Sequence, residues 1–213
     1  MRFQGRVTRR EWGFELPGVV RLAQEADAAR VHAIYAPLVR ETAISFELEP
    51  PTVEEIGRRI RTTLEELPWL VYEQNGEVAG YAYAGRFRAR PAYVWTVEVT
   101  LYVDALYRRR GVGSALYRTL FECLRLLGYR TAVAGIAYPN PASVRLHERL
   151  GFTPVGVFHN VGNKLGRWHD VGWWELTLRE LPNQPTPPRP LPSCVNSAEW
   201  SEALAPGFTS LNP

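Results

Sequence analysis

A turn rich in arginine and glycine has the residue types that bind an anion. It lies between an apolar run that ends near Asp104 and a leucine-rich run over 113–127. Glycines let a backbone approach a ligand closely, and the first N–H groups of a helix have no partner within it. The spacing fits a phosphate-binding turn, and it fits equally a tight strand-to-helix connection without a ligand. The residues of this turn are Arg108, Arg109, Arg110, Gly111, Val112, Gly113 and Ser114.

The strand predicted before this turn, over 93–103, has two different faces. Because side chains alternate along a strand, Glu98, Thr100 and Tyr102 share one face. The apolar residues on the other face are Val97, Val99, Leu101 and Val103. A carboxylate at 98 is therefore not required to lie in the apolar core.

The rest of the chain predicts strands and helices that position these residues. Helices are expected to follow Asp27, Thr52 and Asn140, which can each cap a first turn, and to cover 113–127. Pro37 is expected to kink the first helix or end it early. Asn75-Gly76 predicts a hairpin. Further strands are expected over 19–22, 69–73, 78–84, 131–137, 153–158 and 171–178. This order predicts an α/β layer with a mostly antiparallel sheet and at least one parallel pair.

Length and composition limit the class of protein. The 213 residues suit one domain, and 46% apolar with 22% charged residues is ordinary for a soluble globular chain. No apolar run is long enough to span a bilayer, and residues 1–10 lack the apolar stretch of a secretory signal, so a cytoplasmic location is expected. Arginines concentrated over 86–110 suit an anionic ligand. The cysteines and histidines have no metal-ligand spacing, and no metal is expected.

The C-terminal segment differs in composition from the rest. Six prolines fall between positions 182 and 192, and the residues after them show no periodicity. We therefore expect an N-terminal extension over 1–18, one domain over 19–182 and an extended, proline-rich tail over 183–213.

Several motifs occur together in a fixed order. The strand Val-Glu-Val-x-Leu-Tyr-Val, the arginine-glycine turn and the segment from Asn140 to Phe152 resemble the acetyl-CoA-binding signature of GNAT N-acetyltransferases. The resemblance covers roughly residues 19–182 and is closer still to the phosphinothricin and methionine-sulfoximine acetyltransferase branch. The marks of that branch are Phe46-Glu47-x-Glu49-Pro50, Tyr83-Ala84-Gly85, Arg88-Ala89-Arg90, Trp95-Thr96-Val97-Glu98 and Gly166 to Gly172.

The resemblance implies a fold and a cosubstrate. The fold would be a mixed, mostly antiparallel sheet of about seven strands flanked by about four helices, with the two central strands splayed apart. Acetyl-CoA would bind in the splay, where Leu101, Tyr102 and Val103 offer backbone groups, and residues 108–114 would hold its pyrophosphate. Asn140 and Ser143 would contact it from the other side of the cleft.

The resemblance also implies catalytic roles. Glu98 would be the general base that leaves the attacking amine neutral, and the alternative is a surface carboxylate paired with an arginine. His147 lies one helical turn after Ser143 and is a candidate acid or orienting group, or else a structural histidine. We expect direct attack in a ternary complex, because Cys123 falls beside the apolar stripe of its helix and suits a buried, inert thiol.

The branch acetylates small amino acids such as phosphinothricin, the basis of its herbicide resistance, methionine sulfoximine and methionine sulfone. The substrate contacts expected from the resemblance are Phe46, Arg88, Arg90, Tyr93, Thr96 and Val97, although Arg88 and Arg90 could instead be exposed edge residues. The branch often has lysine at 88 and arginine at 47, so the carboxylate of Glu47 could repel an anionic substrate. A homodimer is expected from the resemblance.

Three other functions fit parts of the sequence. A GNAT enzyme that acts on a protein or peptide amine would need an open groove. A non-catalytic acyl-CoA sensor would have no use for Glu98. A nucleic-acid binder would need more than one basic turn, and the chain lacks a basic helix or an aromatic platform.

Overall fold

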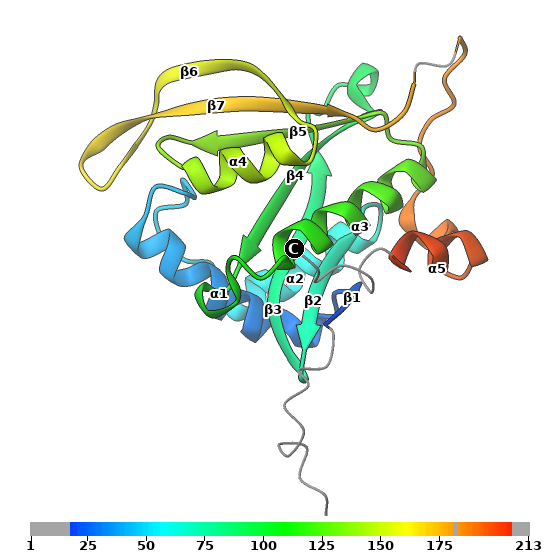
Figure 1. Ribbon diagram of the computed structural model, residues 1–213, viewed down its shortest axis with the longest axis horizontal. Coiled ribbons are helices and arrows are strands. Elements are labelled where there is room, and N and C mark those ends of the chain that lie inside the picture. Colours follow the sequence, from blue (N-terminus) through cyan, green and yellow to red (C-terminus); the bar gives the residue numbers. More distant parts are fainter. Residues whose placement is uncertain (1–17, 181–182, 206–213) are drawn as a thin grey trace, which may run out of the picture.

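A computed structural model describes residues 18–180 and 183–205 of the chain. Seven strands form one sheet in the order β1-β2-β3-β4-β5-β7-β6 (Figure 1). The strands are β1 Val19–Leu22, β2 Trp69–Gln74, β3 Glu77–Arg86, β4 Thr96–Val103, β5 Thr131–Ala137, β6 Thr153–Lys164 and β7 Arg167–Thr177. The predicted mixed sheet of about seven strands is confirmed.

The pairing of the two central strands is short. Strands β4 and β5 are the parallel pair, and their register runs only from Thr96↔Thr131 to Glu98↔Val133. The other neighbouring strands pair antiparallel. Beyond Glu98, β4 remains paired with β3 alone, so the edge of β4 that faces β5 is left without a strand partner. The expected splay between the central strands is confirmed.

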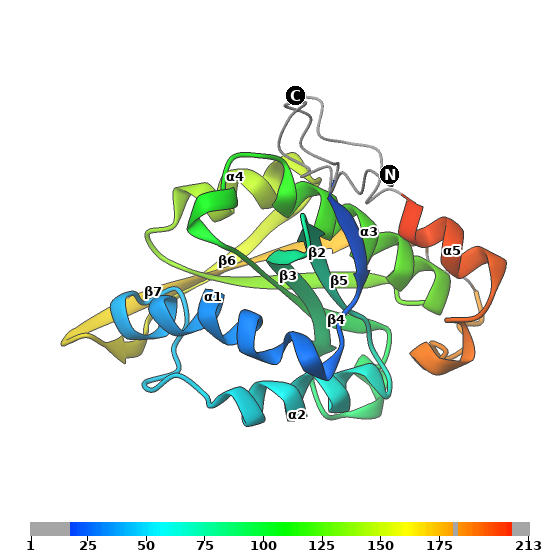
Figure 2. The same ribbon diagram turned by 90° about the horizontal axis from the view of Figure 1, so that it is seen from below.

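Helices cover both faces of the sheet. Figure 2 shows α1 and α2 on one face and α3, α4 and α5 on the opposite side. The helices are α1 Ala28–Glu41, α2 Val53–Leu64, α3 Val112–Leu127, α4 Pro141–Arg149 and α5 Ala198–Leu204. The described residues thus contain five α-helices, one more than the sequence led us to expect.

Local signals explain where several elements begin and end. The Thr52 hydroxyl accepts a hydrogen bond from the Glu55 amide at 3.1 Å and caps α2, as predicted. Asn75 and Gly76 both have positive φ angles, 54° and 83°, which is the geometry of a two-residue hairpin turn. Gly128 has a φ of 100° and ends α3.

The two faces of β4 serve different cores. Val97 and Val99 belong to the core beneath α3, with Leu101 and Val103 packed against it. Tyr102 packs against a second core that α1 and α2 form with β2 and β3. The predicted alternation along this strand is confirmed, and it turns Glu98 away from the α3 core.

The bounds of four elements differ from the predictions. Helix α1 continues through Pro37 to Glu41, because its buried residues on either side of the proline pack into the second core. Strand β4 begins at Thr96 instead of residue 93, since Pro91 opens a 3-10 turn over Pro91–Tyr93. Strands β6 and β7 are longer than expected and form an arm that extends past the rest of the sheet (Figure 1).

Part of the segment predicted as a C-terminal tail, residues 191–204, is folded. This segment contains a 3-10 turn, Leu191–Ser193, and helix α5, which packs against α3. Trp200 is only 3% exposed and joins the core beneath α3. The Ser197 hydroxyl caps α5 by accepting a bond from the Trp200 amide at 3.2 Å. The division of the chain into extension, domain and tail stays a prediction.

Among the helices of the described residues, none has the length and apolar character of a membrane span.

Candidate active site

A cavity of about 480 Å³ lies at the central splay. Its walls come from β4 and β5 where they no longer pair, from the loop between α1 and α2, from α4 and from the β6–β7 arm. The predicted site residues that line this cavity are Phe46, Glu98, Leu101, Tyr102, Asn140, Ser143 and His147. Residues from distant parts of the chain therefore meet at one place.

The Glu98 side chain is half-buried in this cavity, on the sheet face covered by α1 and α2. Burial raises the pKa of its carboxyl, and the nearby positive charge of Arg88 opposes that rise. No hydrogen bond joins the carboxylate to another group in the described part of the chain. A raised pKa and free oxygens are the properties that a general base needs near neutral pH.

His147 has both ring nitrogens engaged. Its Nδ1 lies 2.8 Å from the carbonyl oxygen of Ser143, which can only accept, so Nδ1 carries a hydrogen. Its Nε2 lies 3.1 Å from the hydroxyl of Tyr117, which can donate to it. The ring is 4% exposed, and burial lowers the pKa of His147. This geometry favours a neutral histidine that orients its neighbours over a protonated acid.

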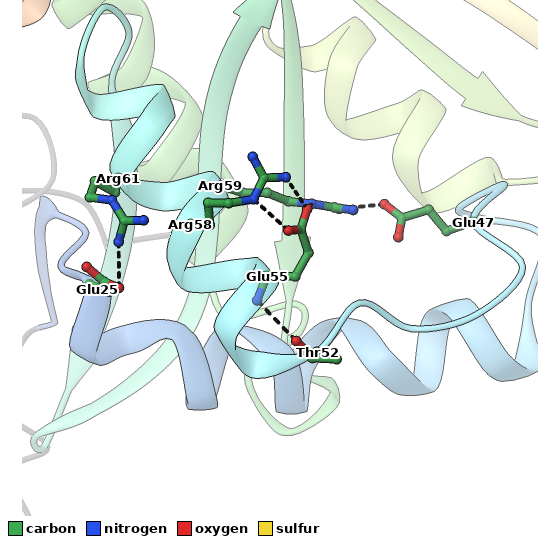
Figure 3. Close-up of polar contacts among 7 residues, drawn as sticks. All are labelled: Glu25, Glu47, Thr52, Glu55, Arg58, Arg59 and Arg61. Atoms are coloured by element: carbon green, nitrogen blue, oxygen red, sulfur yellow. Dashed lines mark hydrogen bonds and ion pairs between the residues drawn. The ribbon is translucent and has the colours of Figure 1, made fainter.

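The loop between α1 and α2 carries Phe46 into the cavity and is held at three points. We call residues 42–52 the acceptor loop. The Ser45 hydroxyl bonds the Tyr35 hydroxyl at 2.6 Å, and the Lys164 ammonium donates to the Ser45 carbonyl at 2.6 Å. The third tie is an ion pair between Glu47 and Arg59 (Figure 3).

This ion pair decides how the carboxylate of Glu47 acts. Glu47 Oε1 lies 2.6 Å from Arg59 Nη1 and is not part of the cavity wall. Arg59 also contacts Glu55 at 2.8 Å. The negative charge at 47 is thus paired with a neighbouring arginine and lies outside the wall of this cavity, which weakens the reason for expecting it to repel an anionic substrate.

The arginine-glycine turn lies at the start of α3, next to the splay. The first backbone bond within α3 runs from the Ala115 amide to the Gly111 carbonyl, so the N–H groups of 112–114 precede the helical ladder. Gly111 has a φ of 82°, and Arg109 has 61°. A Cβ at Gly113 would lie 3.1 Å from Leu101 and 3.2 Å from Leu146, so that glycine serves close packing.

The charges of the turn face solvent. Arg108, Arg109 and Arg110 are exposed, while Val112 is buried and Ser114 is partly buried. Exposed cations around free helix N–H groups fit the diphosphate of a CoA thioester. The unpaired backbone groups along the edge of β4 can hydrogen bond to an extended ligand chain, such as the chain of a CoA thioester, as a neighbouring strand would.

The expected substrate contacts outside the cavity wall are scattered. Arg88 and Arg90 are exposed, and Arg88 lies 4.3 Å above the ring of Phe87. Tyr93 is exposed in the 3-10 turn, and Thr96 is partly buried at the start of β4. Val97 is 1% exposed within the core, which leaves its side chain no room for a substrate. Val103 also lies outside the cavity wall.

Sequence reasoning did not find several residues of the site. Tyr117 on α3 lines the cavity and pairs with His147, but its position in a leucine stripe signals only burial. Trp173 and Ile44 form apolar walls, and Lys164 and Arg59 hold the acceptor loop. These roles depend on contacts between distant segments. No group of three potential metal ligands occurs among the described residues, and burial raises the pKa of the Cys123 thiol well above its usual range.

Comparison with known proteins identifies the family. Residues 20–173 match the profile of the acetyltransferase (GNAT) domain. A phosphinothricin N-acetyltransferase of Streptomyces viridochromogenes is 43% identical over 175 residues, 82% of this chain and 95% of that protein. An L-methionine sulfoximine/L-methionine sulfone acetyltransferase of Salmonella typhimurium is 37% identical, over 76% of this chain and 95% of that protein.

A solved structure supports the same conclusion. The GNAT superfamily phosphinothricin acetyltransferase of Sinorhizobium meliloti, in complex with AcCoA, is 34% identical. It aligns with a TM-score of 0.76 over 80% of this chain and 94% of that one. This chain belongs to the GNAT acetyltransferase family. The prediction of an acetyl-CoA-dependent N-acetyltransferase is therefore confirmed.

Proposed function

We propose that the chain transfers the acetyl group of acetyl-CoA to the primary amine of a small amino acid or analogue. The acceptors we favour are of the phosphinothricin, methionine sulfoximine or methionine sulfone type, which the names of its relatives give. The observation that carries this proposal is the half-buried Glu98 in a cavity at the end of the β4–β5 pairing.

The chemistry follows from the positions of these groups. The ammonium of the acceptor gives up one proton to the Glu98 carboxylate, directly or through a water, and the lone pair of the neutral amine attacks the thioester carbon. A nitrogen–carbon bond forms and the carbon–sulfur bond breaks. The nitrogen then loses a second proton, which the leaving thiolate takes up to give the CoA thiol. His147 and Tyr117 lie at the cavity wall as an orienting pair that holds α4 against α3.

Cosubstrate binding would use the start of α3. The N–H groups of 112–114 and the arginines of the turn would hold the diphosphate, and Asn140 and Ser143 would approach from α4. Leu101, Tyr102 and Val103 would offer backbone groups along the unpaired edge of β4. A backbone donor aimed at a developing oxyanion contributes about 3 kcal/mol in other enzymes.

A homodimer is part of this proposal. Exposed apolar side chains cluster on the β6–β7 arm: Val155, Val157, Phe158, Val161, Leu165 and Trp168, the last of these 64% exposed. Phe158 and Val161 also line the cavity, so a second copy seated on the arm would close the site. Light scattering should give twice the chain mass, and Val155→Glu should lower it. A protein that remains monomeric at about 50 µM, a concentration well above the dissociation constants of stable complexes, would contradict the dimer.

We place the enzyme in the cytoplasm, where acetyl-CoA is made and used.

A thiol-release assay tests the function. The protein is mixed with acetyl-CoA and one acceptor at a time: phosphinothricin, methionine sulfoximine, methionine sulfone, common amino acids and a short peptide. We expect turnover with the first three and little with the peptide. Glu98→Gln should lower turnover about 100-fold or more and leave acetyl-CoA binding intact. Release only with peptides would show that a protein amine is the acceptor.

A further inference from the structure

A second cavity lies beside the active site, between α2 and the sheet. Its volume is about 280 Å³. Aromatic rings form most of its wall: Tyr35, Trp69, Tyr81, Tyr83 and Tyr102. Trp69 and Tyr83 stack at 4.2 Å with an angle of 12° between their planes. We call this cavity the aromatic pocket.

The sheet register places the aromatic pocket next to Glu98. Residues that pair directly across two strands point to the same face, and Gly85 pairs with Glu98 while Tyr83 pairs with Thr100. A Cβ built at Gly85 would meet nothing within 4 Å. Tyr102 is part of the wall of both cavities. The two cavities therefore meet at Tyr102, and Gly85 lies on the same sheet face between Tyr83 and Glu98, with no side chain filling the space above it.

The aromatic pocket offers uncharged hydrogen-bond donors. The indole nitrogen Nε1 of Trp69 is buried and has no hydrogen-bond partner in the described part of the chain. A buried donor without a partner is costly, and because this nitrogen has almost no accessible surface, a ligand oxygen would bond it after a small shift of the surrounding rings. Tyr81 is 2% exposed, and burial raises the pKa of its hydroxyl well above the usual range, so it remains a donor at any ordinary pH.

The charged groups around the aromatic pocket are paired. Arg58 and Arg59 lie at its wall. Both guanidinium groups contact Glu55 at 2.8 Å, and Arg59 also contacts Glu47 (Figure 3). A ligand group here would meet aromatic surface, neutral donors and a rim of balanced charge. Those properties match an oxygen-rich group that accepts hydrogen bonds, such as a sulfone, a sulfoximine or a phosphinate.

We propose that the aromatic pocket binds the oxygen-bearing end of the acceptor's side chain, with Trp69 and Tyr81 as the donors and Gly85 as the passage beside Glu98. This subsite rests on the proposed function, because it presumes an amino-acid acceptor whose amine lies at Glu98. It makes Tyr81 and Gly85 determinants of specificity, whereas Glu98 serves every acceptor alike.

Methionine sulfone and methionine are a matched pair of probes, since they differ only by the two sulfone oxygens. With the unchanged protein we expect kcat/KM for the sulfone to exceed that for methionine about 10-fold or more, the effect of one or two neutral hydrogen bonds. Tyr81→Phe should reduce this ratio about 3-fold to 10-fold through the KM of the sulfone and leave methionine unchanged. Tyr129→Phe, the same change in the core beneath α3, should leave the ratio as it is.

A second variant tests the passage. Gly85→Ala should raise the KM of both acceptors and leave the KM of acetyl-CoA unchanged, because a methyl group at 85 enters open space without meeting the protein. If Tyr81→Phe keeps the full preference for the sulfone, or if Gly85→Ala has no effect on either acceptor, the subsite is wrong while the acetyltransferase reaction stands. If the unchanged protein acetylates neither probe nor any other amino acid, the proposed function itself fails.

A third measurement does not depend on turnover. The indole N–H signal of Trp69, assigned by its loss in Trp69→Phe, is followed by NMR in protein saturated with CoA. Methionine sulfone should shift this signal, and methionine should shift it less. An unmoved Trp69 signal at a saturating concentration of the sulfone would overturn the proposal even if Tyr81→Phe failed to fold.

Discussion

The guanidinium of Arg59 on α2 lies 2.6 Å from the carboxylate of Glu47 in the acceptor loop (Figure 3). Arg59 belongs to the wall of the aromatic pocket, and Glu47 follows Phe46, which belongs to the wall of the active-site cavity. One ion pair thus joins the two cavities and fixes the loop between them. Both side chains are about a third exposed, so its contribution is to geometry more than to stability.

Reversing the charges of this ion pair should distinguish the effect of the loop's position from the effect of the charge at residue 47. Glu47→Arg alone places two guanidinium groups together and should raise the KM of the acceptor about 3-fold to 10-fold, with a small effect on kcat. The double variant Glu47→Arg, Arg59→Glu restores the ion pair between 47 and 59, a coupling of about 1 kcal/mol, but places a second carboxylate beside Glu55, so it should recover part of the loss. Steady-state kinetics with acetyl-CoA held at saturation measures both. Equal defects in the single and double variants would mean that the pair does not position the loop.

The pH dependence of the reaction should report Glu98. Because burial raises the pKa of its carboxyl, the rise of kcat/KM with pH should occur above the ordinary range of a glutamate. Arg88 lowers that pKa, so Arg88→Ala should move the acidic limb to higher pH. The displacement should be small and should shrink in high salt, since Arg88 is exposed. Arg90→Ala is a control that should leave the limb where it is.

Glu98 should also cost stability at neutral pH. An acid whose pKa is raised in the folded state binds its proton more tightly there than in the unfolded chain, so stability falls as pH rises from the unfolded value through the folded one. Glu98→Gln removes the charge and should raise Tm at pH 7, with a gain that disappears below about pH 4, under the ordinary pKa of glutamate. Thermal melts at both pH values test this. An equal gain at pH 4 and pH 7 would assign the effect to packing.

Helix α5 should contribute measurably to folding. Trp200→Ala removes a large side chain from the core beneath α3 and should lower the free energy of unfolding by about 3–5 kcal/mol. Glu202→Ala on the same helix is exposed and should change it by less than about 0.5 kcal/mol. Urea unfolding gives both values. Identical midpoints for the two variants would show that α5 does not belong to the folding unit.

Much of the fold could be predicted because its signals are local. The alternation along β4 and the Asn75-Gly76 turn depend on a few adjacent residues. The start of β4 was misplaced because Pro91 opens a 3-10 turn within an apolar stretch. Helix α5 was missed since its seven residues follow a proline-rich run, and its formation depends on contact with α3.

The candidate site was predictable in its backbone and less so in its side chains. The turn before α3 and the strand with Glu98 carry motifs that set their own geometry. The acceptor loop does not, because its position depends on Lys164, which lies 119 residues from Ser45 along the chain. Tyr117 meets His147 only after α3 and α4 have packed. Single-sequence patterns contain no signal for such pairs.

The contact between α5 and α3 has a consequence for anyone who joins this enzyme to another protein. The Arg189 amide bonds the Leu127 carbonyl at 2.8 Å, at the opposite end of α3 from the arginine-glycine turn. A fusion joint made directly after β7 would remove the C-terminal segment that packs on α3, the helix at whose start we propose that the cosubstrate binds. A joint placed after Leu204 would keep it, and should give the tagged enzyme the heat tolerance of the untagged one.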